Sequence, residues 1–203
     1  TQKVVYLTFD NGYENGFTES ILDTLKAENV PATFFLTGHY LESATPLVQR
    51  MVADGHIIGN HSYNHPNMAK LSDEEILKEW QLFDEKLKEL TKVNRTYYAR
   101  PPEGIYNERV LKVGIENNYR HIFWSIAFKD WDRNSTLPAS YAYDALMKQL
   151  HPGAIILMHS VARHNAEALP QFIKDAKAKG YTFASIDDLV MSYELEKLNL
   201  FGQ

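Results

Sequence analysis

The side chains best suited to chemistry in this sequence stand at the ends of short apolar segments. Carboxylates, imidazoles and guanidinium groups move protons, bind metal ions and hold anions in enzyme sites. The residues concerned are Asp10 and Asn11 after VVYLTF, His61 and His65 after IIGN, Arg100 after TYYA, Asp130 in KDWD and His159 after AIILM. Asp-Asn-Gly is also ordinary turn sequence, so the significance of these residues depends on whether the segments end at one place.

The elements that must position these residues follow from the periodicity of the sequence. Strands are predicted at 4–10, 32–37, 56–60, 97–100, 121–126, 154–159 and 182–186, and helices at 18–29, 46–55, 72–90, 108–118 and 166–180. Strands that alternate with helices are typical of a parallel sheet, whose active site lies at the carboxyl ends of the strands. A doubly wound sheet and a closed barrel both agree with this pattern.

The segment 72–90 gives the clearest helix signal. Ser72 and Glu75 have the spacing of a capping box, in which each side chain bonds the backbone of the other residue. An apolar stripe at helical spacing predicts the buried face of this helix, formed by Ile76, Trp80, Phe83 and Leu87.

Composition limits the class of protein. The 203 residues suffice for one domain, expected over 1–203 with its core at about 4–190 and a tail at 191–203. A net charge of -5 argues against nucleic acid or an anionic membrane as partner. No apolar run reaches the ~20 residues of a membrane span, and without cysteine neither a disulfide nor a thiolate ligand can form.

We expect a monomer. The first residue is Thr1 and not Met, so we expect a removed secretory leader, with a truncation made for expression as the alternative.

His61 and His65 are the strongest candidates for metal ligands. Residues at i and i+4 can place two imidazoles on one ion, although Pro66 favours an irregular turn over a helix here. Two imidazoles need a third ligand with an oxygen atom, which Asp10 or Asn11 could supply. The alternative is a pair of unrelated surface histidines.

Five ordered motifs, TFDNG, HSYNH, RPPEG, KDW and LMH, together resemble the polysaccharide deacetylases, carbohydrate esterase family 4. The resemblance covers residues 4–190 and implies a deformed (β/α)7–8 barrel that carries out metal-assisted amide hydrolysis. A divalent ion, zinc in the first place with cobalt, manganese or magnesium as alternatives, would activate the attacking water.

The resemblance also implies a role for each matched residue. Asp10 would be the catalytic base and His159 the general acid, while Arg100 would orient the base. Asp130 would pair with Arg100 or tune His159. The ligand positions fall on Asn11, His61 and His65, a wall of the acetyl-methyl pocket on Leu157, and the oxyanion-binding N–H near Glu103.

Two positions depart from the family pattern. Asn11 replaces a second aspartate, from which we expect weaker metal retention and a more acidic bound water. Glu103 stands where the family often has an aromatic residue. The stretches TFDNGYENG and PATFFLTGHYL resemble the N-acetylmuramic acid deacetylases of spore-forming bacteria. That likeness implies peptidoglycan glycan strands as substrate, muramic δ-lactam in spore cortex as the eventual product, and an exported enzyme on the cell-wall side of the membrane.

Three further residues are candidates for substrate contacts. Trp131 adjoins Asp130 and is expected in a pocket wall, Tyr13 is expected to line the cleft, and Arg163 could bind the lactyl carboxylate of muramic acid. The alternative for each of them is a loop residue with no role in binding.

Three other functions stay open from the sequence. One is deacetylation of N-acetylglucosamine in peptidoglycan or chitin oligomers, and the second is a non-catalytic carbohydrate-binding barrel. A Ser-His-Asp hydrolase with Ser160 or Ser62 is the third, although neither serine lies in a G-x-S-x-G motif.

Overall fold

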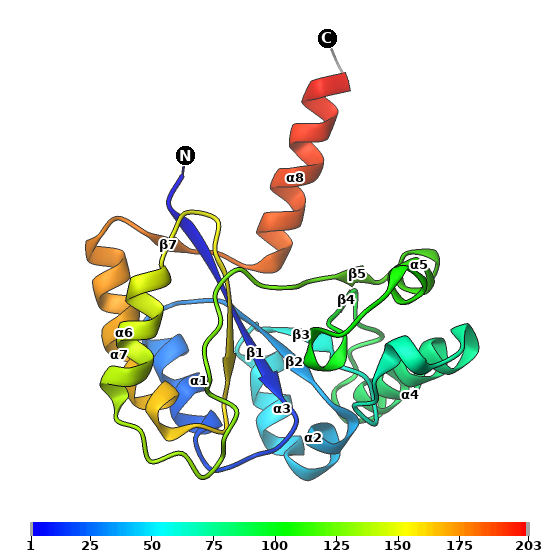
Figure 1. The fold of residues 1–203 in the computed structure, drawn as a ribbon, viewed down its shortest axis with the longest axis horizontal. Helices are drawn as coiled ribbons and strands as arrows, with labels where there is room; N and C mark the ends of the chain where they lie inside the picture. The colour runs from blue at the N-terminus through cyan, green and yellow to red at the C-terminus, as the bar shows by residue number, and fades with distance from the viewer. Residues whose placement is uncertain (1, 202–203) are drawn as a thin grey trace.

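The computed structural model describes residues 2–201 and has a curled parallel sheet at its centre (Figure 1). Its strands are β1 (Val4–Asn11), β2 (Ala32–Leu36), β3 (Ile57–Asn60), β4 (Tyr98–Ala99), β5 (Arg120–His121), β6 (Ile155–His159) and β7 (Thr182–Phe183). The order across the sheet is β5-β4-β3-β2-β1-β6, and β7 pairs with the first residues of β1. Residues 5–11 of β1 are buried, as expected for a parallel strand covered on both faces.

The segment that follows β5 closes the curled sheet. The prediction of a strand over 121–126 is wrong for most of its length, because regular pairing with β4 ends at His121. The chain then crosses towards β6, where Ile126 forms a single parallel bridge with Ile156. Between these points the carbonyls of Ile122 and Phe123 accept hydrogen bonds from the Arg100 side chain. The (β/α) barrel is therefore deformed, because in this segment the Arg100 side chain, and not a neighbouring strand, donates to the backbone carbonyls.

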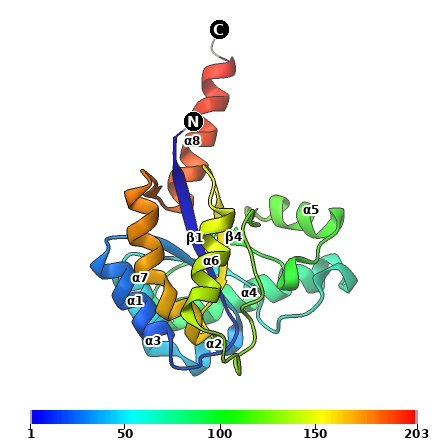
Figure 2. The same ribbon diagram turned by 60° about the vertical axis from the view of Figure 1, so that its left-hand side comes forward.

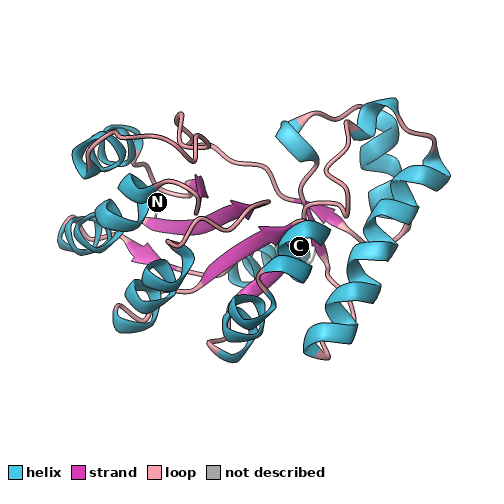
Figure 3. Cartoon of the chain, turned by 90° about the horizontal axis from the view of Figure 1, so that it is seen from below, coloured by secondary structure: helices cyan, strands magenta, loops and turns pink. Residues whose placement is uncertain are grey.

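Helices surround this sheet (Figures 2 and 3). They are α1 (Thr18–Ala27), α2 (Gly38–Ser43), α3 (Thr45–Ala53), α4 (Asp73–Thr91), α5 (Glu108–Glu116), α6 (Ala139–Gln149), α7 (Arg163–Ala178) and α8 (Ile186–Phe201), with short 3-10 helices η1 (Met68–Lys70) and η2 (Pro102–Gly104). The capping box of α4 is confirmed, and all four residues of its predicted apolar stripe are fully buried. Helices α2, α6 and α8 were not predicted.

Helix α8 projects from the rest of the molecule (Figure 1), and the expected tail at 191–203 continues it as far as Phe201. Residues 202–203 lie outside the described part of the chain. Within the described residues, no helix combines the length and the apolar character needed to span a membrane.

Candidate active site

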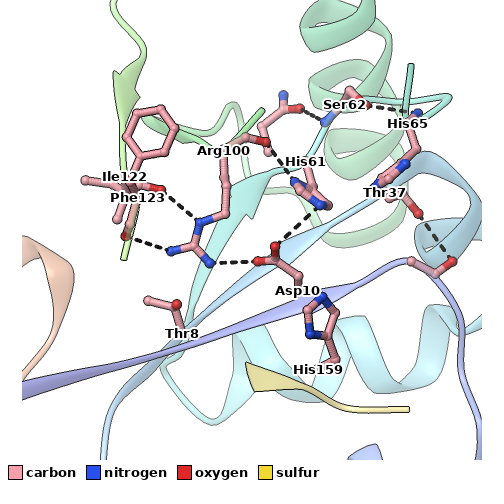
Figure 4. Close-up of polar contacts among 12 residues, drawn as sticks. Thr8, Asp10, Thr37, His61, Ser62, His65, Arg100, Ile122, Phe123 and His159 are labelled. Atoms are coloured by element: carbon pink, nitrogen blue, oxygen red, sulfur yellow. Dashed lines mark hydrogen bonds and ion pairs between the residues drawn. The ribbon is translucent and has the colours of Figure 1, made fainter. Parts of the chain in front are cut away.

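The register of the parallel strands brings the predicted residues together at the carboxyl edge of the sheet. Asp10 on β1 lies directly opposite His159 on β6, so the two side chains project to the same side (Figure 4). On the other flank β3 ends at Asn60, and His61 follows it. The next strand, β4, delivers Arg100 one residue after its end.

Asp10 is held by a buried guanidinium. Arg100 Nη1 donates to Asp10 Oδ1 at 2.7 Å, and its other nitrogens donate to the carbonyls of Ile122 and Phe123 at 2.8 and 3.2 Å. The Arg100 side chain is fully buried and lies over the ring of Phe35. With its donors fixed by protein atoms, the guanidinium holds the carboxylate in one orientation.

The same contacts set the charge of Asp10. Burial alone would raise its pKa, but the positive surroundings, with the Arg100 charge first and its hydrogen bond in addition, hold the pKa below its usual value. Asp10 is thus a carboxylate at neutral pH, and its second oxygen remains available to accept a proton.

His61 faces that second oxygen as a neutral imidazole. Its Nδ1–H donates to the carbonyl of Arg100 at 2.7 Å, which leaves the lone pair on Nε2. Burial lowers the pKa of His61 to about 4, so the 3.5 Å approach of Nε2 to Asp10 Oδ2 is not an ion pair at neutral pH. Two acceptor atoms facing each other are stabilised by a positive charge placed near them.

His65 reaches the same place through an irregular turn, as Pro66 predicted. Ser62 and His65 both have left-handed backbone conformations, with φ of 67° and 56°. Ser62 Oγ accepts from the His65 backbone N–H at 3.0 Å and stabilises the turn. The imidazole rings of His61 and His65 are 5.0 Å apart between centroids.

Asn11 supplies an unpaired oxygen. Its Nδ2 donates to Ser160 Oγ at 2.7 Å. Its Oδ1 is buried and has no hydrogen-bond partner among the described residues. A buried orphan oxygen is rare in native proteins and is compatible with a metal ligand. Together with the imidazoles of His61 and His65, this oxygen makes a donor set that suits a divalent cation.

His159 occupies the opposite wall with a carboxylate behind it. Its Nδ1 donates to Asp130 Oδ1 at 2.8 Å, and its backbone N–H donates to Asp130 Oδ2 at 2.8 Å. Asn165 Nδ2 also donates to Asp130 Oδ2, at 2.6 Å. Burial lowers the pKa of His159, but the bond to Asp130 and its negative charge outweigh burial and raise the pKa above its usual value. Asp130 thus contacts His159, and its hydrogen bonds do not include Arg100.

Four of these residues border one cavity of about 620 Å³. Its polar wall includes Asp10, His61, His65 and His159. Tyr13, Glu103, Trp131 and Leu157, four of the predicted substrate contacts, also line it, together with Trp124, Phe128 and four further residues. Asn11, Arg100 and Asp130 are not in the lining.

Glu103 and Arg163, two of the predicted substrate contacts, differ in their relation to the cavity: Glu103 lines it and Arg163 does not. Glu103 sits in η2 with a left-handed φ of 57°. Arg163 is the first residue of α7 and lies outside the cavity lining, although Val161 two residues earlier is part of it. The Arg163 Nε lies 3.6 Å from Glu167 Oε1, and both side chains are exposed.

The structure adds two residues to the site that sequence reasoning missed. Asn165 holds Asp130, and no local pattern links residues 35 positions apart. Ser160 bonds Asn11, whereas the sequence suggested it only as a rival nucleophile. Ser160 and Ser62 are both fully buried, and no hydrogen bond joins either hydroxyl to His159 in the described structure.

A site of this kind can hydrolyse an amide. Asp10, a carboxylate, and His159, an imidazole with a raised pKa, lie in one cavity. A pair of this kind can take and give protons on opposite sides of a carbonyl carbon. The apolar walls can hold a small acyl group and exclude water.

Comparisons with known proteins agree with this chemistry. The family model for polysaccharide deacetylase matches residues 1–122. The peptidoglycan-N-acetylmuramic acid deacetylase PdaA of Bacillus subtilis is 47% identical over 194 residues, 96% of this chain and 74% of its own length. A peptidoglycan-N-acetylglucosamine deacetylase of Bacillus cereus is 35% identical over 95% of this chain and 70% of its own.

Solved structures share the fold. The structure of Bacillus subtilis PdaA, a family 4 carbohydrate esterase, matches with a TM-score of 0.92 over 95% of this chain and 82% of that one. A pseudoenzyme of the same esterase family from Bacillus anthracis matches at 32% identity with a TM-score of 0.86, over 93% of this chain and 66% of that one. Fold alone therefore does not decide activity. By its family match and its relatives, this chain belongs to the polysaccharide deacetylase family.

Proposed function

We propose that this protein is a metal-dependent deacetylase that removes the N-acetyl group from N-acetylmuramic acid residues of peptidoglycan. The observation that carries the catalytic part is the placement of Asp10 and His159 in one cavity, with Arg100 behind the first and Asp130 behind the second. The 47% identity to PdaA supports the choice of sugar. Peptidoglycan lies outside the cytoplasm, so the proposal includes export to the cell-wall side of the membrane.

Polysaccharide deacetylases are metal-dependent in general. Asn11, His61 and His65 would hold the ion, for which zinc is our first choice. When bound, a divalent cation at these residues would polarise the acetamide carbonyl and lower the pKa of a nearby water.

The residues of the chain itself supply the proton transfers. Asp10, kept ionised by Arg100, takes a proton from the attacking water. His159, whose pKa is raised by Asp130, donates to the nitrogen of the leaving amine, which is a very poor leaving group as an anion. The wall at Leu157 accommodates the acetyl methyl group. The backbone N–H near Glu103 is proposed to bind the developing oxyanion.

Mass spectrometry of the products tests this proposal. Glycan strands stripped of peptide are incubated with the protein and Zn²⁺, and we expect loss of acetyl groups from muramic residues. A chelator and Asp10→Asn serve as controls and should both stop the loss. Loss from glucosamine residues alone would support the alternative function, which the Bacillus cereus relative favours. If no acetate is released, a non-catalytic carbohydrate-binding barrel becomes the better description.

Arg163 is the proposed contact for the lactyl carboxylate of the muramic residue. Its exposed pair with Glu167 is long, so the guanidinium can exchange this partner for a substrate anion at little cost. Arg163→Ala should raise KM for peptide-free muramic residues by about tenfold, the value of one charge-assisted hydrogen bond. Arg109→Ala is the matched control and should leave KM unchanged, because Arg109 also forms an exposed ion pair, with Asp73, and lies outside the cavity lining. Equal KM values for Arg163→Ala and wild type would exclude this contact.

A further inference from the structure

An asparagine at a metal-ligand position has two orientations, and one of them is useless. Its oxygen and nitrogen are alike in size, but the oxygen attracts a cation while the NH₂ group repels it. An aspartate presents oxygen in both orientations. A site built on Asn11 therefore needs a group that fixes which end of the carboxamide faces the ion.

Ser160 is the group that contacts the nitrogen end. Asn11 is the last residue of β1, and Ser160 follows His159, the last residue of β6. Because Asp10 and His159 are register partners, the next residue on each strand also lies beside its neighbour. Both Asn11 and Ser160 are fully buried, and the Nδ2–Oγ distance is 2.7 Å. The carboxamide oxygen is left with no other partner in the described structure.

We propose that Ser160 is a positioning residue that selects the orientation of the Asn11 carboxamide and directs Oδ1 to the metal. This inference builds on the metal dependence in the proposed function. A hydroxyl accepts a hydrogen bond from an amide but donates one to a carboxylate. Ser160 can therefore orient Asn11. An aspartate at position 11 would present an oxygen in either orientation and would not depend on Ser160.

The proposal predicts that the effect of Ser160 on metal binding depends on the residue at position 11. Four proteins form the test: wild type, Ser160→Ala, Asn11→Asp and the double variant. Their Zn²⁺ dissociation constants are measured by competition with a chromophoric chelator, without reference to activity. Ser160→Ala should weaken Zn²⁺ binding by about tenfold, the lower range for loss of a group that orients a metal ligand. In the Asn11→Asp background the same change should alter affinity by less than about threefold.

Two controls separate orientation from folding. Ser160→Thr keeps the hydroxyl and should restore wild-type Zn²⁺ affinity. Thermal unfolding of each metal-free protein reports the structural cost of the substitution separately from its effect on Zn²⁺ affinity. Equal losses of affinity in the wild-type and Asn11→Asp backgrounds, or no loss in either, would overturn the proposal.

This outcome is independent of the substrate. A protein that binds Zn²⁺ with the predicted coupling but releases no acetate would contradict the proposed function and leave the role of Ser160 intact. Acetate release with no coupling would do the reverse. If the wild-type protein binds no Zn²⁺ at all, both fail.

Discussion

The two histidines that flank Asp10 differ in the partner of Nδ1, and this difference suits them to the different roles proposed for them. His61 Nδ1 donates to a backbone carbonyl, which is neutral, and burial brings the pKa of His61 to about 4. His159 Nδ1 donates to the carboxylate of Asp130, and its pKa is raised. Burial lowers the pKa of both rings, and it does so more completely for His61, whose side chain is 5% exposed against 24% for His159. The charge of Asp130 opposes burial only at His159.

One edge of the sheet can therefore hold both a proposed metal ligand, His61, and a proposed general acid, His159. A ligand must be an unprotonated imidazole, whereas an acid must carry its proton at working pH. Asp10 lies between the two and needs a negative charge for its role, which Arg100 provides. The arrangement can be broken by removing Asp10, then its support Arg100, and finally the carboxylate behind His159, in order of decreasing expected effect.

The largest effect is expected for Asp10→Asn. This change keeps the size of the side chain and removes the base, so kcat should fall by at least about 10³-fold, near the upper contribution of general-base catalysis. Acetate release from peptide-free glycan is the measurement. Thermal unfolding should show a folded protein, since Asn can still accept from Arg100. A kcat within tenfold of wild type would assign the base to another group.

Arg100→Met tests the support of Asp10. The change leaves a buried carboxylate without its partner and two carbonyls without donors. The free energy of unfolding, measured in urea, should fall by about 3–5 kcal/mol, as for other broken buried pairs. Arg120→Met is the matched control, because Arg120 pairs with Glu194 at the surface and its loss should cost less than about 1 kcal/mol. Similar losses of unfolding free energy for the two variants would mean that the buried pair of Arg100 stabilises the fold no more than a surface pair does.

How much of this arrangement could be predicted depends on the range of the interactions. The strand ends of Asp10, His61 and His159 follow from short apolar runs, and the parallel sheet that unites them follows from alternation with helices. The capping box of α4 is local and was predicted correctly. Parallel topology thus places catalytic residues before any side-chain contact is known.

Long-range contacts explain the failures. The segment after His121 looks like a strand because it is apolar, but its carbonyls at Ile122 and Phe123 bond Arg100 and not a neighbouring strand. Helix α6 fully buries only Ala142 and Leu146, so its periodicity is weak. The sequence also left open whether Asp130 pairs with Arg100 or with His159, because both residues are distant from Asp130 in the sequence and only the folded structure shows which of them lies beside it.

Asp130→Asn removes the negative charge behind His159. A carboxamide carries no charge, so the pKa of His159 loses the main partner that raises it and should fall. The acid must be protonated to act, so activity falls as pH rises through the pKa of His159. In the variant this descending limb of the pH profile of kcat should therefore move to lower pH. At a pH where wild type is fully active, kcat should drop by about 10- to 100-fold, within the range of general-acid catalysis.

The shape of the pH profile is the decisive readout for Asp130→Asn, because partial unfolding lowers the whole curve without moving its limbs. Asn165→Ala provides the matched control, since it removes one donor from Asp130 Oδ2 but leaves the carboxylate on Nδ1 of His159. Its descending limb should stay at or above the wild-type position, because a carboxylate with fewer donors is a stronger partner for the imidazolium. A descending limb that is identical in wild type and Asp130→Asn would mean that the proton is delivered by another group, and that the carboxylate behind His159 only fixes its ring.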